Sequence, residues 1–307
     1  MTPIDESMRG VHVIAVTPFR ADGAIDWESC DRMVDAYLGA GADGLTVLGM
    51  MGEAPKLTAE ESRAVVRRIL ARVEGRVPVT VGVSAPGLAQ IAQLAAEVME
   101  DGAAGVMIAP PGSLRTDDQI AGYYAQAAES IGDVPFVLQD FPLVTGVQIA
   151  PGVIGRIVAE LPTCVCLKHE DWPGLDKITA LRAEGFLPRR IAILCGNGGL
   201  FLPEEMERGA DGAMTGFAYP EMMVGVVAAH AAGDMERARD LFDAYLPLAR
   251  LEQQPGLGLA IRKYVLARRG IIADATLRRP GAALSARGRA EVDRLIERQE
   301  RRLRALG

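Results

Sequence analysis

The sequence predicts an α/β fold, a closed (β/α)8 TIM barrel with additional C-terminal helices. Short apolar runs of β character alternate with amphipathic segments of helical length, and this alternation repeats eight times in residues 1–225. The predicted strands are apolar almost throughout, which is typical of parallel strands buried on both faces. These observations favour a barrel in which a helix follows each strand.

Each predicted strand is short and is bounded by Gly or Pro. In chain order, the predicted strands span residues 11–19, 44–49, 78–84, 105–111, 135–141, 164–170, 192–197 and 212–216. An open, doubly wound sheet is the alternative fold. Such a sheet usually has a glycine-rich phosphate turn after its first strand, and "VTPFRADGA" does not contain one.

Helical periodicity is clear between the strands. In residues 58–73, apolar side chains recur at three- and four-residue spacing, and Thr58 with Glu61 forms a capping-box pattern at the start. Residues 87–103 show the same periodicity, and Gly102 is placed to end that helix. Helices are therefore expected in both segments.

No linker or low-complexity segment divides the chain. We therefore expect a single structural unit, in which residues 1–225 form the barrel and residues 226–307 form a helical extension packed on it. The extension is longer than one barrel helix. Extra helices are expected to pack on the barrel or on a partner subunit.

The net charge of −7 argues against nucleic acid as a partner, because phosphate binding needs a basic surface. Arginines do gather near the C-terminus, but the interleaved glutamates are typical of a solvated helix face. The sequence shows neither a signal-peptide pattern nor an apolar run of membrane-spanning length. A cytoplasmic protein without membrane contact is expected.

The cysteines do not form a recognisable metal site. None of Cys30, Cys164, Cys166 and Cys195 belongs to a CxxC pair, and the chain has only three histidines. A zinc site needs clustered ligands at short spacing. We therefore expect reduced thiols in the core, no metal ion and no organic cofactor.

Lys168 closes the sixth predicted strand, in the stretch "TCVCLKHED". In a (β/α)8 barrel the chemistry occurs at the carboxyl ends of the strands. Alternation places Lys168 on the same face as Cys164 and Cys166. An amine in the barrel mouth, above an apolar floor, can attack a ketone and form a Schiff base. A lysine that only extends into solvent from the strand end is the alternative.

Five segments, in the correct order, resemble the dihydrodipicolinate synthase / N-acetylneuraminate lyase family of Schiff-base aldolases and lyases. They are "VTPF" (16–19), "GMMGE" (49–53), "LKHED" (167–171), "CGNGG" (195–199) and "GADGAMTGFAYP" (209–220). The resemblance covers nearly the whole chain. It implies a (β/α)8 barrel with a C-terminal helical portion, a homo-oligomer (commonly a tetramer, otherwise a dimer) and Lys168 as the imine-forming residue.

The sequence also departs from this family. Gln139 stands where the family has a proton-relaying tyrosine, and an amide is not a general acid–base near neutral pH. Met50 and Met51 replace the hydroxyl residues of the family's G-[ST]-[ST]-G-E loop. Val144 stands where lysine-biosynthesis members carry an arginine for a substrate carboxylate. These departures argue against true dihydrodipicolinate synthase activity and against N-acetylneuraminate cleavage.

A glutamine in a Q-D-x-P context resembles a divergent branch of the family that includes 2-keto-3-deoxy sugar-acid dehydratases, such as the L-2-keto-3-deoxyarabonate enzyme. We expect a Schiff-base-forming lyase that acts on a 2-oxo acid. Dehydration of a 2-keto-3-deoxy sugar acid and pyruvate-dependent aldol chemistry both fit the sequence. A catalytically inactive barrel that binds or senses a 2-oxo acid is the alternative from another class.

The predicted site has two groups of residues. The catalytic residues are Lys168, as the nucleophile, and Gln139, which would orient the imine or a substrate oxygen. The predicted substrate-binding residues are the loop residues whose backbone amides would hold the carboxylate, together with two that would line the pocket: Gly49, Met50, Met51, Gly196 and Met214. The methionines would make the pocket apolar and adaptable.

The proton carrier stays open at this point. The candidates are bound water, the substrate's own carboxylate, Thr145, Asp140 and Glu170. Alternation turns Asp140 and His169 away from the face of Lys168, so a supporting structural role is expected for both. Glu53 lies at a loop-to-helix junction, where a carboxylate stabilises exposed backbone amides, and a structural role is expected there too.

Overall fold

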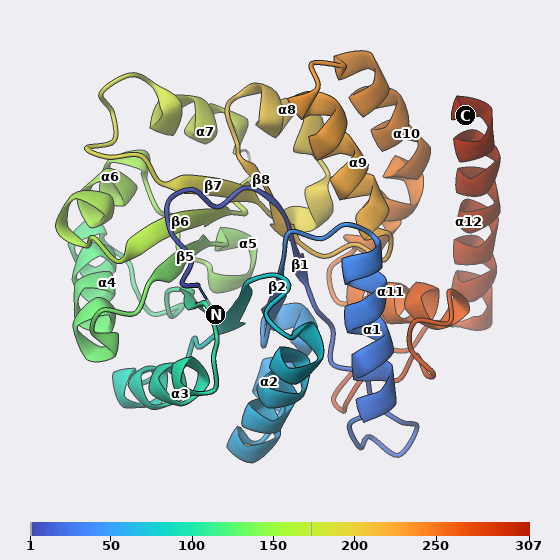
Figure 1. Cartoon of the computed structure of the whole chain (residues 1–307), viewed down its shortest axis with the longest axis horizontal. Helices are drawn as coiled ribbons and strands as arrows, with labels where there is room; N and C mark the ends of the chain where they lie inside the picture. The colour runs from blue at the N-terminus through green and yellow to red at the C-terminus, as the bar shows by residue number, and fades with distance from the viewer. Residues whose placement is uncertain (1, 173) are drawn as a thin grey trace.

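The computed structural model describes residues 2–172 and 174–307, and its strands close into one parallel barrel (Figure 1). Neighbouring strands pair in parallel all the way round, including the first with the last. The prediction of a (β/α)8 barrel is confirmed. The strands are β1 (Gly10–Ile14), β2 (Gly44–Val47), β3 (Val79–Gly82), β4 (Gly105–Ile108), β5 (Phe136–Asp140), β6 (Cys164–His169), β7 (Ala192–Cys195) and β8 (Gly212–Thr215).

Helices surround the barrel, and α12 lies beyond α10 and α11 at the edge of the molecule (Figure 1). The barrel helices are α1 (Trp27–Gly39), α2 (Ala59–Val73), α3 (Leu88–Glu100), α4 (Asp117–Ile131), the short α5 (Pro142–Thr145), α6 (Pro151–Glu160), α7 (Leu175–Arg182), α8 (Leu202–Glu207) and α9 (Pro220–Ala231). The C-terminal helices are α10 (Met235–Glu252), α11 (Gly258–Arg268) and α12 (Ala286–Leu306). The 3-10 turns are η1 (Met50–Gly52), η2 (Ala54–Lys56) and η3 (Asn197–Gly199).

The local sequence signals act as expected in two helices. Thr58 accepts a hydrogen bond from the backbone of Glu61, and the Glu61 side chain accepts one from the backbone of Thr58, so the capping box of α2 is complete. Helix α3 ends at Glu100, and Gly102 follows with a φ of +103°. Glycine reaches this conformation without the strain that a side chain would add.

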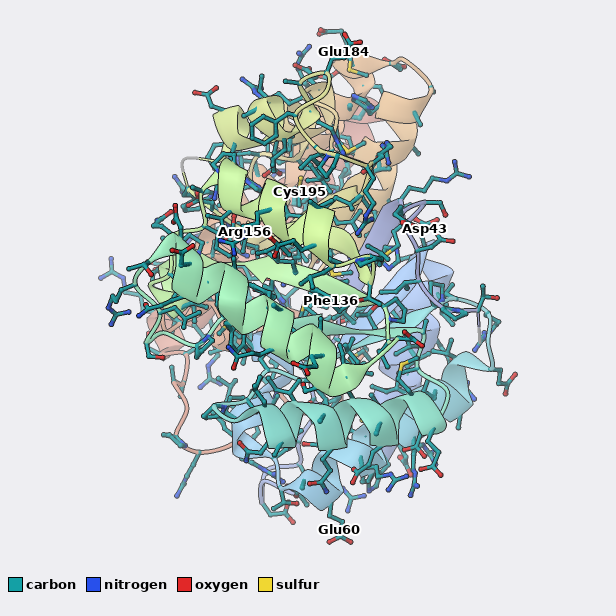
Figure 2. All side chains as sticks on the ribbon, turned by 90° about the vertical axis from the view of Figure 1, so that its left-hand side faces the viewer. Asp43, Glu60, Phe136, Arg156, Glu184 and Cys195 are labelled. Atoms are coloured by element: carbon teal, nitrogen blue, oxygen red, sulfur yellow. The ribbon has the colours of Figure 1, made fainter. Side chains whose placement is uncertain are left out.

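The apolar core has two layers. Outward-facing strand residues pack against the helices, and a smaller set fills the barrel interior: Ile14, Met107, Val137, Cys166, Leu194 and Met214. Cys195 and Phe136 are fully buried in the outer layer, whereas Glu60 and Glu184 project from the periphery (Figure 2). The interior layer forms an apolar floor beneath the carboxyl ends of the strands.

Each predicted strand runs past the observed end of the strand on the carboxyl side. The largest difference is in β1, predicted over residues 11–19 but ending at Ile14. Residues 15–19 are buried loop, in which Thr17 donates from its hydroxyl to the Gly52 carbonyl at 2.6 Å and Pro18 has no N–H for a ladder. These loop residues are as apolar as a strand, so composition alone does not mark the boundary.

The expectation that Cys164 shares a face with Lys168 is wrong. The register between β5 and β6 shifts, because Phe136 pairs with Cys164 while the next residue, Val137, pairs with Cys166. This bulge inserts one extra residue and breaks the alternation. Cys164 therefore packs in the outer layer, and Cys166 remains in the interior below Lys168.

The four cysteines are buried free thiols, and burial raises the pKa of Cys30 and of Cys164 to about 12. Within residues 2–172 and 174–307, no group of three or more His, Cys, Asp or Glu side chains is placed to hold a metal ion. In the same ranges, no helix combines the length and the apolar character needed to cross a membrane.

The C-terminal helices reach the mouth of the barrel. Helix α10 packs against α9, α11 and α12, and α11 carries two adjacent, fully buried cations, Arg262 and Lys263. Arg262 bonds to the carbonyl of Gly216 after β8, and Lys263 bonds to Glu53 in the loop after β2. The extension therefore contributes to the end of the barrel where the sequence places the chemistry.

Candidate active site

A small cavity lies at the carboxyl ends of the strands. Its volume is about 40 Å³, and it is enclosed by side chains from the barrel loops and from the C-terminal helices. The lining residues are Ile14, Met50, Met51, Gln139, Phe141, Lys168, Glu170, Asn197, Gly198, Thr215, Gly216, Gln253 and Arg262. The position agrees with the rule that barrel enzymes bind substrate at this face.

Lys168, Gln139 and Glu170 form a compact polar cluster in this cavity. Lys168 Nζ lies 3.0 Å from Glu170 Oε2. Gln139 Nε2 donates to the same oxygen at 2.7 Å. Each of the three residues is 4% exposed. Gln139 and Lys168 are also register partners in β5 and β6, so the sheet itself sets their separation.

The backbone holds Glu170 from both sides. Its N–H donates to the Asp140 carbonyl at 2.8 Å, and its carbonyl accepts from Asn197 Nδ2 at 3.0 Å. Gly196 lies directly behind the side chain, because a Cβ at this position would be 2.0 Å from Glu170 Cγ. Gly196 therefore leaves the space that the Glu170 side chain occupies beside Lys168.

The predicted site residues fall into two sets. Lys168, Gln139, Met50 and Met51 all line the cavity. The other three predicted residues, Gly49, Gly196 and Met214, are not among the lining residues. A Cβ on Gly49 would lie 3.4 Å from Ile14, Gly196 backs Glu170, and Met214 is fully buried in the interior layer.

Met50 and Met51 are the first residues of the 3-10 turn η1. The leading N–H groups of a helical turn have no acceptor within that turn, so they are available to an anion. Met50 is 44% exposed at the rim of the cavity. An exposed, unbranched methionine moves readily, so this side of the cavity can adapt to a ligand.

Asp140 and His169 face away from the cavity, as alternation predicted. Lys177 Nζ bridges Asp140 at 2.8 Å and Asp171 at 2.6 Å behind the barrel wall. Burial raises the pKa of Asp140, and the charge of Lys177 opposes that change. His169 Nδ1 lies 3.8 Å from Glu205. These residues support the wall of the site from outside.

Among the protein groups considered as proton carriers, Glu170 alone lines the cavity. Thr145 donates from its hydroxyl to the Phe141 carbonyl at 3.0 Å and belongs to α5. Asp140 points to Lys177 on the outer side. A carboxylate at 3.0 Å from the candidate nucleophile fits acid–base work.

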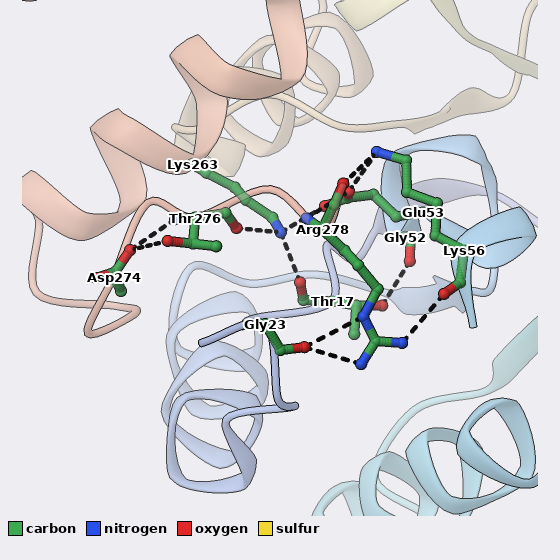
Figure 3. A network of polar contacts seen from close by, with 9 residues as sticks. All are labelled: Thr17, Gly23, Gly52, Glu53, Lys56, Lys263, Asp274, Thr276 and Arg278. Atoms are coloured by element: carbon green, nitrogen blue, oxygen red, sulfur yellow. Dashed lines mark hydrogen bonds and ion pairs between the residues drawn. The ribbon is translucent and has the colours of Figure 1, made fainter. Parts of the chain in front are cut away.

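Glu53 is the centre of a buried network behind the η1 loop (Figure 3). Its carboxylate contacts Lys263 Nζ at 2.6 Å and Lys56 Nζ at 2.7 Å, and accepts the backbone N–H of Arg278 at 3.1 Å. Burial lowers the pKa of Lys263, and Glu53 opposes that change. The network ties the loop to the C-terminal segment, which is the structural role expected for Glu53.

The sequence reasoning missed the side chains that the C-terminal helices bring to the cavity. Arg262 on α11 and Gln253, the C-cap residue that follows α10, both line it. Their positions are set by helix packing across the barrel mouth, and no local sequence pattern signals it. Asn197 and Thr215, from the loop after β7 and the end of β8, were also not singled out.

The comparisons with known proteins agree with the fold. The model of the dihydrodipicolinate synthetase family matches residues 7–299. A solved structure, that of dihydrodipicolinate synthase from Rhodopseudomonas palustris, is 54% identical with a TM-score of 0.95 and covers 97% of this chain and 100% of that one.

Two curated relatives carry different activities in their names. The 4-hydroxy-tetrahydrodipicolinate synthase of Chlorobium luteolum is 30% identical over 296 residues, which are 94% of this chain and 97% of the relative. The L-2-keto-3-deoxyarabonate dehydratase of Azospirillum brasilense is 30% identical over 294 residues, which are 92% of each chain.

Proposed function

Because the chain belongs to the dihydrodipicolinate synthetase family and is therefore a class I lyase, we propose that it dehydrates a 2-keto-3-deoxy sugar acid through a Schiff base on Lys168. The supporting observation is the position of Glu170, with Oε2 3.0 Å from Lys168 Nζ inside the cavity. Glu170 offers the acid–base group that Gln139 lacks.

Imine formation is the first step. A proton passes from Lys168 Nζ to Glu170 along their 3.0 Å contact, which leaves a free amine. The amine attacks the C2 carbonyl of the substrate. The carbinolamine hydroxyl then takes the proton back from Glu170 and leaves as water, which gives the protonated imine and restores the Glu170 carboxylate. The apolar floor beneath Lys168, which includes Cys166 and Met214, excludes competing water.

Elimination follows from the same contact. The C3 carbon is one bond from the imine carbon, so a carboxylate beside Nζ reaches a proton on C3. Glu170 removes that proton, and the electron pair forms the enamine. The enamine expels the C4 hydroxyl, which leaves as water after taking the proton from Glu170. Hydrolysis of the imine then releases the product and restores Lys168.

The remaining predicted residues take binding roles in this proposal. The backbone amides of the loop at Gly49, Met50 and Met51 hold the C1 carboxylate. Gln139 holds Glu170 in place by donating to its Oε2 at 2.7 Å. Gly196 positions Glu170, and Met214 supports the floor of the pocket.

Dihydrodipicolinate synthase activity is the second candidate. The sequence argued against it, because the tyrosine and the loop hydroxyls are replaced. The names of the relatives favour this activity, above all that of the 54% identical structure with a TM-score of 0.95. This activity needs an aldehyde acceptor for the enamine, so both reactions belong in one assay panel.

Borohydride trapping tests the proposal. The purified protein is incubated with pyruvate or with a series of 2-keto-3-deoxy sugar acids, then reduced and mapped by peptide mass spectrometry. Lys168→Ala is the control. We expect an adduct on Lys168, and release of a dehydrated product from at least one sugar acid. Absence of any adduct from folded protein would remove the Schiff-base mechanism.

The turnover assay separates the candidates. Product from pyruvate and an aldehyde acceptor, without sugar-acid dehydration, would favour the synthase. Cleavage of a sugar acid to pyruvate would favour the aldolase reaction. Trapping without turnover of any 2-oxo acid would favour a barrel that only binds its ligand.

We also propose that the chain forms a homo-oligomer. The wall beside the site exposes apolar side chains: Trp172 is 38% exposed and Phe201 is 41% exposed, and their rings stack edge to face at 5.6 Å. Light scattering during size-exclusion chromatography measures the subunit count. A monomeric mass at working concentrations would contradict this proposal.

A further inference from the structure

Arg262 is buried in the wall of the active-site cavity, and its three guanidinium nitrogens differ in their hydrogen bonds. The residue is 1% exposed. Its Nε donates to Glu252 Oε1, and its Nη2 donates to the Gly216 carbonyl. Among the described residues, Nη1 has no hydrogen-bond partner. Burying a charged donor without an acceptor costs folding free energy, so we expect this nitrogen to have a hydrogen-bond acceptor.

The surroundings hold Nη1 at the cavity. A Cβ on Gly216 would lie 2.1 Å from Nη1, so only a glycine leaves room for the guanidinium here. Both Gly216 and Arg262 line the cavity that contains Lys168. Both oxygens of Glu252 already accept a hydrogen bond, Oε1 from Arg262 Nε and Oε2 from the backbone N–H of Ala218 at 3.1 Å.

Gln253 shows the same feature as Arg262, on the same cavity. Its Nε2 is buried and has no partner among the described residues, although the side chain lines the same cavity. Gly198, with a φ of +65°, leaves the space, since a Cβ there would lie 2.1 Å from Nε2. Two unpaired donors from the C-terminal helices therefore accompany the catalytic cluster.

We propose that Arg262 and Gln253 form the specificity site for a terminal carboxylate on the substrate, at the end opposite the 2-oxo group. A carboxylate accepts only, so it satisfies both donors at once, and its charge strengthens both bonds. The substrate class is then a 2-oxo-3-deoxy dicarboxylic acid. This inference rests on the proposed imine mechanism and narrows its substrate.

The two regions of the cavity come from different strands. Gly216 and Gly198 follow β8 and β7, whereas the η1 loop proposed for the C1 carboxylate follows β2. Lys168, on β6, contributes to the cavity that both regions share. One end of the substrate would lie at each region, with C2 at the lysine.

Trapping with matched 2-oxo acids tests the inference without requiring turnover. The probes are 2-oxoadipate and 2-oxohexanoate, which have six carbons each and differ in the terminal carboxylate. Pyruvate is the third ligand. For each, the concentration that gives half-maximal borohydride trapping on Lys168 is measured. We expect 2-oxoadipate to need a concentration at least about tenfold lower than 2-oxohexanoate.

The variants assign the preference to residues. Gln253→Leu removes one donor and keeps the Arg262–Glu252 pair, so it should reduce the preference about threefold or more. The double variant Arg262→Met with Glu252→Gln removes both buried charges together and should abolish the preference. Gln254→Leu, at an exposed neighbouring position, is the matched control. Thermal melting identifies any variant that does not fold, and Gln253→Leu keeps the test decisive if the double variant fails.

The outcomes are distinct. Equal half-maximal concentrations for the two six-carbon acids, with normal trapping by pyruvate, would overturn this inference and leave the imine mechanism standing. A preference that survives in both Gln253→Leu and the folded double variant would also overturn it. Absence of trapping by all three ligands would overturn the imine mechanism, and this inference with it.

Discussion

Lys168 Nζ lies 3.0 Å from Glu170 Oε2 in the mouth of the barrel, and both side chains are shielded from solvent. The two residues are separated by one position, so they face the same side of the chain, and the loop residue continues the alternation of β6. In the proposed mechanism the Glu170 carboxylate first takes a proton from the Lys168 amine and later removes the proton on C3.

Replacing Glu170 with Gln should separate imine formation from elimination. Glutamine keeps the size of the side chain but cannot take a proton, so we expect kcat for dehydration to fall about 10²- to 10⁴-fold. Borohydride trapping on Lys168 after long incubation should still label the protein. Steady-state kinetics and peptide mass spectrometry measure the two effects. Glu184→Gln, at an exposed position, is the control, and a Glu170→Gln variant with unchanged kcat would contradict the assigned role.

Gly196→Ala should impair the enzyme through Glu170. The new Cβ would lie 2.0 Å from Glu170 Cγ and 2.5 Å from its Cδ, so the carboxylate must leave its place beside Lys168. The φ of −107° at Gly196 lies outside the left-handed region that favours glycine, so the expected effect is the steric contact with Glu170. We expect kcat to fall about tenfold or more.

Gly152→Ala is the matched control for this change. Gly152 lies in α6, and a Cβ there meets nothing within 4 Å. Gly152 is the second residue of α6, and alanine in place of a helical glycine should raise stability slightly, by up to about 1 kcal/mol, and leave kcat unchanged. Equal kinetics for Gly196→Ala and Gly152→Ala would show that Gly196 does not position Glu170.

The sequence was sufficient to predict the barrel and the position of Lys168 near the end of a strand, because both depend on local patterns. Strand and helix periods alternate along the chain, and a lysine ends an apolar strand. The side on which Glu170 lies could also be predicted from the sequence, because residues two positions apart in a strand face the same side. The sequence does not single it out among the candidate proton carriers, because it does not say which loop residues turn inward.

Other features depend on contacts between distant segments. The bulge that moves Cys164 to the outer layer arises from the register of β5 against β6. Arg262 enters the cavity because α11 crosses the barrel mouth and Gly216 leaves space for its guanidinium. Neither relationship has a signature within a window of one strand or helix, so a single sequence does not predict it.

Lys263→Met should destabilise the protein strongly. Lys263 Nζ bonds to Glu53 at 2.6 Å and to the Thr17 carbonyl at 2.7 Å, and the residue is 0% exposed. Removing it leaves a buried carboxylate with a weaker set of partners, at a cost of about 3–5 kcal/mol. Urea unfolding at pH 7 measures the change in free energy.

A double-mutant cycle provides the control for this prediction. Glu53→Gln removes the opposite charge, so the Lys263→Met and Glu53→Gln variant should lose less stability than the sum of the two single variants. The difference is the coupling energy of the pair. Additive losses would mean that the two residues do not stabilise the loop as a pair.

Glu61→Gln should reveal an ion pair with a defined pH dependence. Arg278 contacts both Glu61 carboxylate oxygens, at 2.6 Å and 2.7 Å, and these contacts lower the pKa of Glu61 to about 2. Because the folded-state pKa lies below the unfolded value, the stabilisation is full above about pH 4.5 and is lost as the pH falls through about 2.

Glutamine can still accept the Thr58 N–H, so Glu61→Gln preserves the capping box, whereas it removes the charge and one of the two acceptors for Arg278. We expect a loss of about 1 kcal/mol at pH 7, because the pair is partly exposed. Urea unfolding of both proteins at pH 7, 5, 4 and 3 should show this difference shrinking over the two most acidic conditions. Glu60→Gln, at the exposed neighbouring position, should show no such trend. A Glu61→Gln difference that stays constant down to pH 3 would mean that the pair with Arg278 is not its source.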